Sequence, residues 1–178
     1  MFIRTHDGLI DTDMELLIQM CRVVDQQLDT FEERFQETPD ADGYGLFDWA
    51  EHVAGAGFVA CQCYLTATYA CVGIPKVEAI QLGPRHQGSG WPIVAAINAA
   101  ANFWKHYPEW PLDRDSRRQD AVRRAFDDLG FPADGEYPLS GILTELTAGI
   151  ARFGPLQIPL EQWRDELMKR KGQHAATG

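Results

Sequence analysis

Apolar side chains recur at alternating steps of three and four residues between positions 14 and 35 of the chain. An α-helix completes one turn in about 3.6 residues, so this spacing places those side chains on one face. We therefore predict a long amphipathic helix over residues 12–37, with acidic residues on its other faces. A Thr12-x-x-Glu15 pattern at its start is typical of a capping box. The apolar seam consists of Met14, Leu17, Cys21, Val24, Leu28, Phe31 and Phe35.

The next long segment, residues 53–72, contains no charged side chain. It is long enough to cross a bilayer, but it consists mostly of Ala, Gly, Cys and Thr, with Gln62 at its centre. A helix buried on all sides of a bundle has the same composition, and we favour that interpretation over membrane insertion. A turn-rich loop over residues 38–45 joins it to the first helix. Helices over 12–37 and 47–72 then form an antiparallel hairpin.

Four shorter helices are predicted in the rest of the chain. Pro108 limits the first of them to about residues 92–107, and Gly130 ends the second. Residues 74–91 form a connection in which VEAIQL is a candidate extended piece. The other three helices cover about residues 115–129, 139–152 and 159–170, with Val122, Ala125, Phe126, Leu129, Leu139, Ile142, Leu143, Leu146 and Ile150 pointing inward.

These elements predict an all-α fold, a helical bundle of about six helices built on a long antiparallel helical hairpin. A length of 178 residues fits one domain. We expect residues 1–171 to form a single helical domain. Residues 172–178, GQHAATG, are expected to form a disordered C-terminal tail.

The negative charge of the chain is confined to its first third. The net charge is −10, and residues 1–51 hold thirteen acidic and three basic side chains, while the two kinds balance in residues 52–178. This acidity argues against non-specific nucleic-acid binding, which needs basic side chains against phosphates. It makes the helix over residues 12–37 a candidate docking surface for a basic protein partner. The arginine-rich segment 114–124 is typical of a solvated helix face with local ion pairs.

The four cysteines, Cys21, Cys61, Cys63 and Cys71, form no CxxC pair and have no histidine at zinc-finger spacing. We expect buried, reduced thiols, as suits a cytoplasmic protein. The opening residues lack the apolar stretch of a signal peptide. The sequence also lacks the Glu-x-x-His motif of di-metal bundles, so we expect neither a metal nor another cofactor.

The helix predicted over residues 92–107 carries an unusual polar stripe. Val94, Asn98, Asn102 and Lys105 share one side, with His106 at its edge. Asparagine forms helices less well than Lys, Glu or Gln, but it offers both a donor and an acceptor on a short stem. Either the asparagines hydrogen-bond a neighbouring backbone, such as a glycine-rich loop, or the stripe lines a cleft. In the cleft, Asn102 and Lys105 would hold an anionic or polar ligand beside His106, which titrates near neutral pH.

The glycine-rich loop GPRHQGSGWP, residues 83–92, precedes this helix. It places Arg85 and His86 just ahead of a helix N-terminus, where free N–H groups favour anions. The Gly-Lys-Ser/Thr signature of a P-loop is absent, and a tight connector is the structural alternative. The candidate ligand-binding residues are Arg85, His86, Asn98 and Asn102, and the candidate catalytic residues are His106 and Lys105.

The hairpin, together with NFWKH at residues 102–106, resembles the HEPN class of bacterial helical domains over about residues 12–129. The catalytic pattern of that class is an arginine, usually followed by a polar residue, with a histidine four to six residues further on. Asn102 and His106 have a compatible spacing, with asparagine in place of the arginine. Arg85 and His86 are closer together than the pattern requires, and another arginine–histidine pair, Arg170 and His174, lies in the C-terminal region.

Many HEPN proteins are ribonucleases of toxin–antitoxin and phage-defence systems, and others are non-catalytic. The resemblance therefore implies an RNA- or nucleotide-binding protein that could cleave RNA without a metal. In that reaction His106 would act as general acid and base, and Lys105 or Arg85 would stabilise the phosphate charge.

Two other interpretations remain open. The chain could be a non-enzymatic interaction protein, such as an immunity protein or antitoxin, that docks a basic partner on the helix over residues 12–37. It could also form a homodimer through the apolar seam of that helix or through the apolar hairpin.

Overall fold

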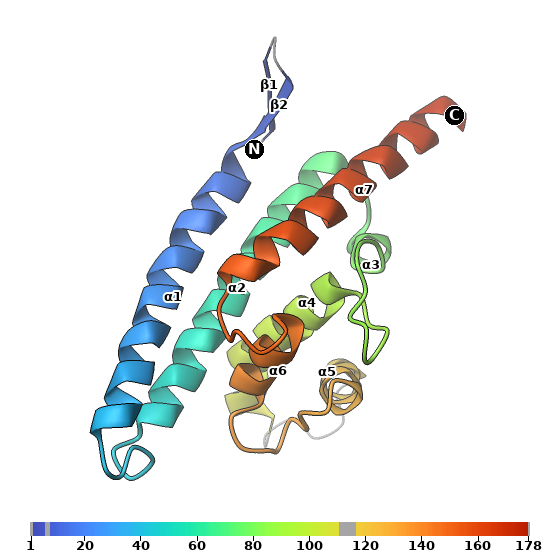
Figure 1. Ribbon diagram of the computed structural model, residues 1–178. Coiled ribbons are helices and arrows are strands. Elements are labelled where there is room, and N and C mark those ends of the chain that lie inside the picture. The colour runs from blue at the N-terminus through green and yellow to red at the C-terminus, as the bar shows by residue number, and fades with distance from the viewer. Residues whose placement is uncertain (1, 6–7, 111–116, 178) are drawn as a thin grey trace.

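The computed structural model describes residues 2–5, 8–110 and 117–177 and shows an all-α fold (Figure 1). A short antiparallel pair, β1 (Phe2–Thr5) and β2 (Gly8–Asp11), precedes the helices and was not predicted. The α-helices are α1 (Thr12–Glu37), α2 (Leu46–Val72), α3 (Lys76–Ala79), α4 (Ile93–His106), α5 (Arg117–Asp128), α6 (Pro138–Leu146) and α7 (Gln157–Thr177). The 3₁₀ segment η1 (Tyr107–Glu109) directly follows α4, and the 3₁₀ segment η2 (Gly154–Leu156) directly precedes α7.

The predicted hairpin of α1 and α2 is confirmed (Figure 1). Five seam residues of α1 are buried: Met14, Leu17, Cys21, Leu28 and Phe31. The N-cap differs from the predicted capping box, because Asp11 Oδ1 accepts the N–H of Met14 at 3.1 Å. At the same end of the hairpin, α2 ends at Val72 and is capped by Gly73, whose φ of 81° suits a residue without Cβ.

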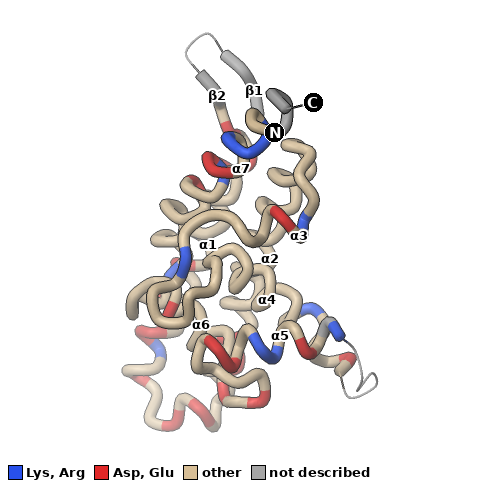
Figure 2. The backbone as a smooth tube through the Cα atoms, turned by 90° about the vertical axis from the view of Figure 1, so that its right-hand side faces the viewer, with Lys and Arg blue, Asp and Glu red and all other residues tan. Residues whose placement is uncertain are grey.

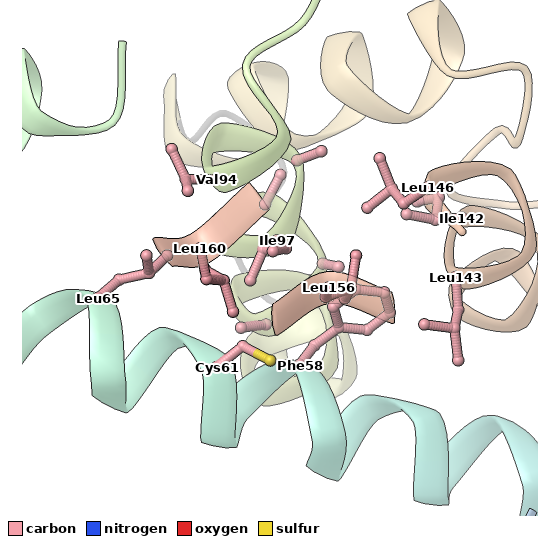
Figure 3. Close-up of a cluster of buried hydrophobic side chains, with 14 of the residues drawn as sticks. Phe58, Cys61, Leu65, Val94, Ile97, Ile142, Leu143, Leu146, Leu156 and Leu160 are labelled. Atoms are coloured by element: carbon pink, nitrogen blue, oxygen red, sulfur yellow. The ribbon is translucent and has the colours of Figure 1, made fainter. Parts of the chain in front are cut away.

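The core lies between α2, α4, α6 and the start of α7 (Figure 3). It contains Phe58, Cys61 and Leu65 of α2, Val94 and Ile97 of α4, Ile142, Leu143 and Leu146 of α6, and Leu156 and Leu160 near the start of α7. Glycines in α2 let its neighbours approach closely, because a Cβ on Gly55 would lie 1.9 Å from Trp104 Cδ1. A Cβ on Gly57 would lie 2.4 Å from the Phe153 ring. The small residues of α2 therefore serve close helix packing.

The predicted helix over residues 139–152 is too long. α6 ends at Leu146, and Ile150, predicted to point inward, is exposed. Thr147 Oγ1 donates to Leu143 O at 2.6 Å and accepts the N–H of Ala151 at 3.1 Å. This threonine competes with the helical backbone bonds, and Gly149, at a φ of 90°, takes the left-handed conformation that ends a helix.

Other element boundaries also differ from the prediction. Residues 77–79 of VEAIQL belong to the short helix α3 rather than to an extended piece. α7 continues through Thr177, whereas residues 172–178 were expected to form a disordered tail. The predicted start of the helix at residue 115 lies outside the described residues, whereas its inward side chains, Val122, Ala125, Phe126 and Leu129, are buried as predicted. Acidic and basic positions are mixed along α5 (Figure 2).

The cysteine prediction holds only in part. All four thiols are free, and Cys21 and Cys61 are buried, but Cys63 and Cys71 are exposed on α2. Within the described segments, no helix combines the length and the apolarity needed to cross a membrane.

Several acidic side chains of the first third hold the fold together. Asp25 accepts the N–H groups of Phe153 and Gly154 at 2.6 and 2.9 Å. Arg152 pairs with both Asp29 and Glu32 of α1. These contacts fasten the segment containing η2 to one flank of α1. The acidity of α1 is therefore partly structural.

Two further carboxylates act at helix starts. Glu51 of α2 accepts the N–H groups of Leu139 and Ser140 at 2.6 and 2.8 Å, which satisfies free donors in the first turn of α6. Asp11 Oδ2 accepts the Tyr64 hydroxyl at 2.8 Å. Burial, and then this hydrogen bond, raise the pKa of Tyr64 well above its usual range, so the phenol stays protonated.

Candidate functional site

The polar stripe of α4 meets one side chain of α2. Gln62, which is 7% exposed, donates through Nε2 to Asn98 Oδ1 and to Asn102 Oδ1, each at 2.9 Å. Its Oε1 accepts from Lys105 Nζ at 2.6 Å. The stripe thus forms a four-residue network across the α2–α4 interface.

Lys105 fixes the direction of every hydrogen bond in this network. A lysine ammonium can only donate, so Gln62 must turn its oxygen toward it. The amide nitrogen of Gln62 then faces both asparagine oxygens. Each asparagine consequently keeps its own amide nitrogen, a donor, on the side away from Gln62. The partly buried Asn98 and Asn102 and the exposed Lys105 therefore offer hydrogen-bond donors to a ligand.

The asparagine pair was expected to bond a neighbouring backbone or to line a cleft, and Gln62 was not predicted as its partner. A signal was present: Gln62 is the polar centre of a charge-free helix, and a buried amide needs hydrogen-bond partners. Asn98 and Asn102, one turn apart on the next long helix, are side chains able to satisfy it.

His106 lies at the last turn of α4, next to Lys105, and is exposed. Its Nδ1 is 3.4 Å from Glu109 Oε2, a loose contact between two exposed side chains. The following segment is held by aromatic packing, with ring centroids 4.5 Å apart for Phe103 and Tyr107 and 5.5 Å apart for Phe103 and Trp110. The end of α4 is therefore fixed while the imidazole remains accessible.

Arg85 and His86 belong to a separate cluster. The glycine-rich loop closes on itself, because Arg85 Nη1 donates to Gly90 O at 2.9 Å and the His86 N–H donates to Trp91 O at 2.8 Å. His86 Nδ1 accepts the N–H of Ser89 at 3.2 Å, so its Nε2 carries the hydrogen that faces Glu145 at 3.1 Å. The loop is thereby tied to α6, as a connector would be.

The two clusters lie at opposite ends of α4. The loop precedes Ile93, whereas Lys105 and His106 lie in the last turn of the same helix. At about 1.5 Å per residue, these ends are roughly 18 Å apart. The structure therefore brings Asn98, Asn102 and Lys105 together through Gln62, and it places Arg85 and His86 at the end of α4 opposite to Lys105 and His106.

No group of three or more metal-ligating side chains is found in the part of the chain that the structure describes. The alternative histidine of the C-terminal region, His174, has a side chain outside that part, and Arg170 pairs with Glu78 at 3.0 Å.

Comparisons with protein-family models, curated proteins and solved structures gave no match. The function of the site is therefore inferred from the hydrogen bonds of the Gln62 network.

Proposed function

We propose that the chain binds the phosphate groups of RNA or of a nucleotide along the donor strip, defined as Asn98, Asn102, Lys105 and His106. The observation that carries this proposal is the fixed direction of the Gln62 network, which turns the asparagine amide nitrogens away from Gln62. Phosphate oxygens accept hydrogen bonds and carry negative charge, so they match a strip of donors that includes an ammonium group.

Cleavage of a bound RNA would use His106, which stands one turn beyond Asn102 and is exposed. An accessible imidazole at this place can take the proton of a 2′-hydroxyl as general base, so that the 2′-oxygen attacks the adjacent phosphorus and the bond from phosphorus to the 5′-oxygen breaks. The imidazolium then returns the proton to the leaving 5′-oxygen as general acid, and Lys105 stabilises charge on the attacked phosphate. This chemistry needs no metal. It agrees with the expected role of the chain as a HEPN-like protein of a toxin–antitoxin or defence system.

Binding of a labelled short RNA and of ATP, followed by fluorescence anisotropy and thermal shift, tests the proposal. We expect Asn102→Ala and Lys105→Ala each to weaken binding about tenfold, since each removes a donor worth about 1 kcal/mol or more. Lys76→Ala, an exposed lysine on α3, is the matched control and should bind like the wild-type protein. The proposal fails if the wild-type protein binds neither probe, or if all three variants bind equally.

A cleavage assay with the same RNA in the presence of EDTA tests the catalytic step. His106→Ala should abolish cleavage while retaining most of the binding, because Lys105 and Asn102 remain. His52→Ala, another exposed histidine, should cleave normally. An RNA that stays intact with the wild-type protein would reduce the proposal to binding alone.

A second candidate function is a non-enzymatic interaction protein that docks a basic partner on α1. The observation in its favour is that Glu15, Glu33 and Glu37 remain exposed on α1, whereas Asp25 and its neighbours bind the η2 segment. Changing these three glutamates to glutamine leaves the structural acids in place. Undiminished binding to a basic partner captured from the host would rule this candidate out.

A further inference from the structure

A second apolar stripe runs along α1, separate from the seam that packs on α2. Leu16, Met20 and Val23 are 57%, 46% and 67% exposed and lie at i, i+4 and i+7. The exposed, uncharged Gln27 and Thr30 continue the same spacing. Because the seam is already buried inside the hairpin, this second stripe is the apolar surface of α1 that remains available to another helix.

The stripe faces away from the rest of the molecule. At about 100° per residue, Leu16, Met20 and Val23 point roughly opposite to Asp25 and Asp29. Those two carboxylates bind the segment that contains η2, which therefore lies on the other flank of α1. In Figure 1 the start of α7 crosses on the viewer's side of α2. Because the stripe points away from the η2 segment that precedes α7, it lies on the opposite side of the hairpin.

The outward side of α2 presents small, uncharged side chains next to this stripe. Ala56, Cys63 and Ala67 are exposed and point roughly opposite to Phe58, whose ring packs on Phe153 with centroids 5.1 Å apart. The stripes of α1 and α2 therefore share the side of the hairpin that the η2 segment leaves open. We define the uncharged face as Leu16, Met20, Val23, Ala56, Cys63 and Ala67.

The shape of the uncharged face fits a second copy of itself. Its α1 half carries large side chains and its α2 half carries small ones, at spacings near the heptad pattern of packed helices. A two-fold pairing that sets α1 of one copy on α2 of the other matches large residues with small ones at both contacts. A second copy of the chain supplies both halves of this contact through the two-fold symmetry.

The size of the face suits a weak, reversible dimer. Two adjacent helices present a strip about 20 Å wide, and the exposed, uncharged side chains from Leu16 to Thr30 of α1 and from Ala56 to just short of Cys71 of α2 extend over about 21–23 Å of each helix. Each copy then contributes roughly 400–450 Å², or about 800–900 Å² in total, which is the size of a weak, reversible interface. Residues 52–72 of α2 carry no charge, so little charge is desolvated when the faces meet.

We propose that the chain forms a two-fold homodimer through the uncharged face, with α1 of each copy packed on α2 of the other. The dimer uses neither the seam between α1 and α2 nor the donor strip, so it stands independently of the proposed ligand. It also accounts for three large apolar side chains that would otherwise be exposed to water on one helix face.

Sedimentation velocity of the wild-type protein and of Leu16→Glu/Val23→Glu at about 100 μM tests the dimer. The wild-type protein should sediment at twice the 20.0 kDa mass of the chain, and the double variant as a monomer with an unchanged helical circular dichroism spectrum. Ile158→Glu, which alters an apolar side chain 63% exposed on α7, is the matched control and should remain dimeric. A monomeric wild-type protein, or a dimeric double variant, overturns the proposal.

Cysteine labelling tests whether the correct face is used. Cys63 lies on the uncharged face and Cys71 near the end of the same helix, and both are exposed in a single chain. A maleimide should label Cys63 at least tenfold more slowly in the wild-type dimer than in Leu16→Glu/Val23→Glu, while Cys71 reacts at the same rate in both. Equal labelling of Cys63 in the two proteins contradicts the proposed interface, whatever the mass of the particle.

Discussion

Gln62 links the packing of α2 and α4 to the chemistry of the donor strip. Its side chain bonds three residues of α4, and its orientation determines which atoms of Asn98 and Asn102 face away from it. A substitution at this position can therefore change the polarity of the strip while leaving the helices in place. Stability and ligand binding can then be separated at a single residue.

The variant Gln62→Glu is expected to fold and to lose the phosphate ligand. A carboxylate only accepts, so both asparagines must rotate their amide nitrogens toward it and present their oxygens outward. Lys105 keeps its partner as an ion pair. We expect a free energy of unfolding within about 1 kcal/mol of wild type and at least tenfold weaker RNA binding, measured by urea titration and by anisotropy.

The variant Gln62→Leu tests how much the network contributes to the stability of the fold. Leucine occupies a similar volume but leaves the partly buried amides and Lys105 without their common partner. Unpaired buried polar groups cost about 1–3 kcal/mol, so this variant should unfold at clearly lower urea concentration. If Gln62→Leu proves as stable as the wild-type protein, the network contributes nothing to the fold.

At the scale of elements, glycines in α2 determine how closely its neighbours approach. Gly55→Ala should lower the free energy of unfolding by about 1–3 kcal/mol, because the new methyl group collides with Trp104. This loss would exceed the gain of up to about 1 kcal/mol from better helix propensity. The matched control is Gly172→Ala in α7, where a Cβ meets no atom within 4 Å and stability should be retained or raised.

The long helices could be predicted from sequence because their signal is repeated many times. The seam of α1 repeats over the whole helix, and its bounds, Thr12–Glu37, match the prediction. The end of α6 could not be predicted in this way. Apolar residues continue at helical spacing to Ile150, but Thr147 and the turn that follows it end the helix. A single side chain that bonds the backbone leaves no periodic trace.

The site was predictable in part for the same reason. The asparagines and Lys105 stood out on a helical wheel, but their partner on α2 is 36 residues from Asn98 in sequence, and local pattern gives no pairing at that distance. The second stripe of α1 was missed although Leu16, Met20 and Val23 are spaced as regularly as the seam. The stronger seam accounted for the helix, and only the fold shows which apolar face remains uncovered.

At the scale of the whole molecule, the negative charge of the chain affects both the proposed dimer and the proposed binding of phosphate, but in different ways. The excess of acidic residues lies in the first third of the chain, which includes α1. Some of these carboxylates are bound within the fold, by Arg152 and by backbone N–H groups of the η2 segment. The remainder acts on any partner that approaches the hairpin, attracting cations and repelling another copy of the chain.

Ionic strength should therefore shift the two equilibria in opposite directions. Each copy carries a net charge of −10, so salt that screens their mutual repulsion should tighten the dimer. Phosphate binding through Lys105 gains from counterion release and should weaken as salt rises. Between 50 and 500 mM NaCl (about 14 to 4 Å in Debye length), we expect the dimer dissociation constant to fall severalfold and the RNA dissociation constant to rise. Sedimentation and anisotropy on one preparation measure both. A dimer that weakens with salt would indicate an interface held by ion pairs, which the uncharged face does not contain.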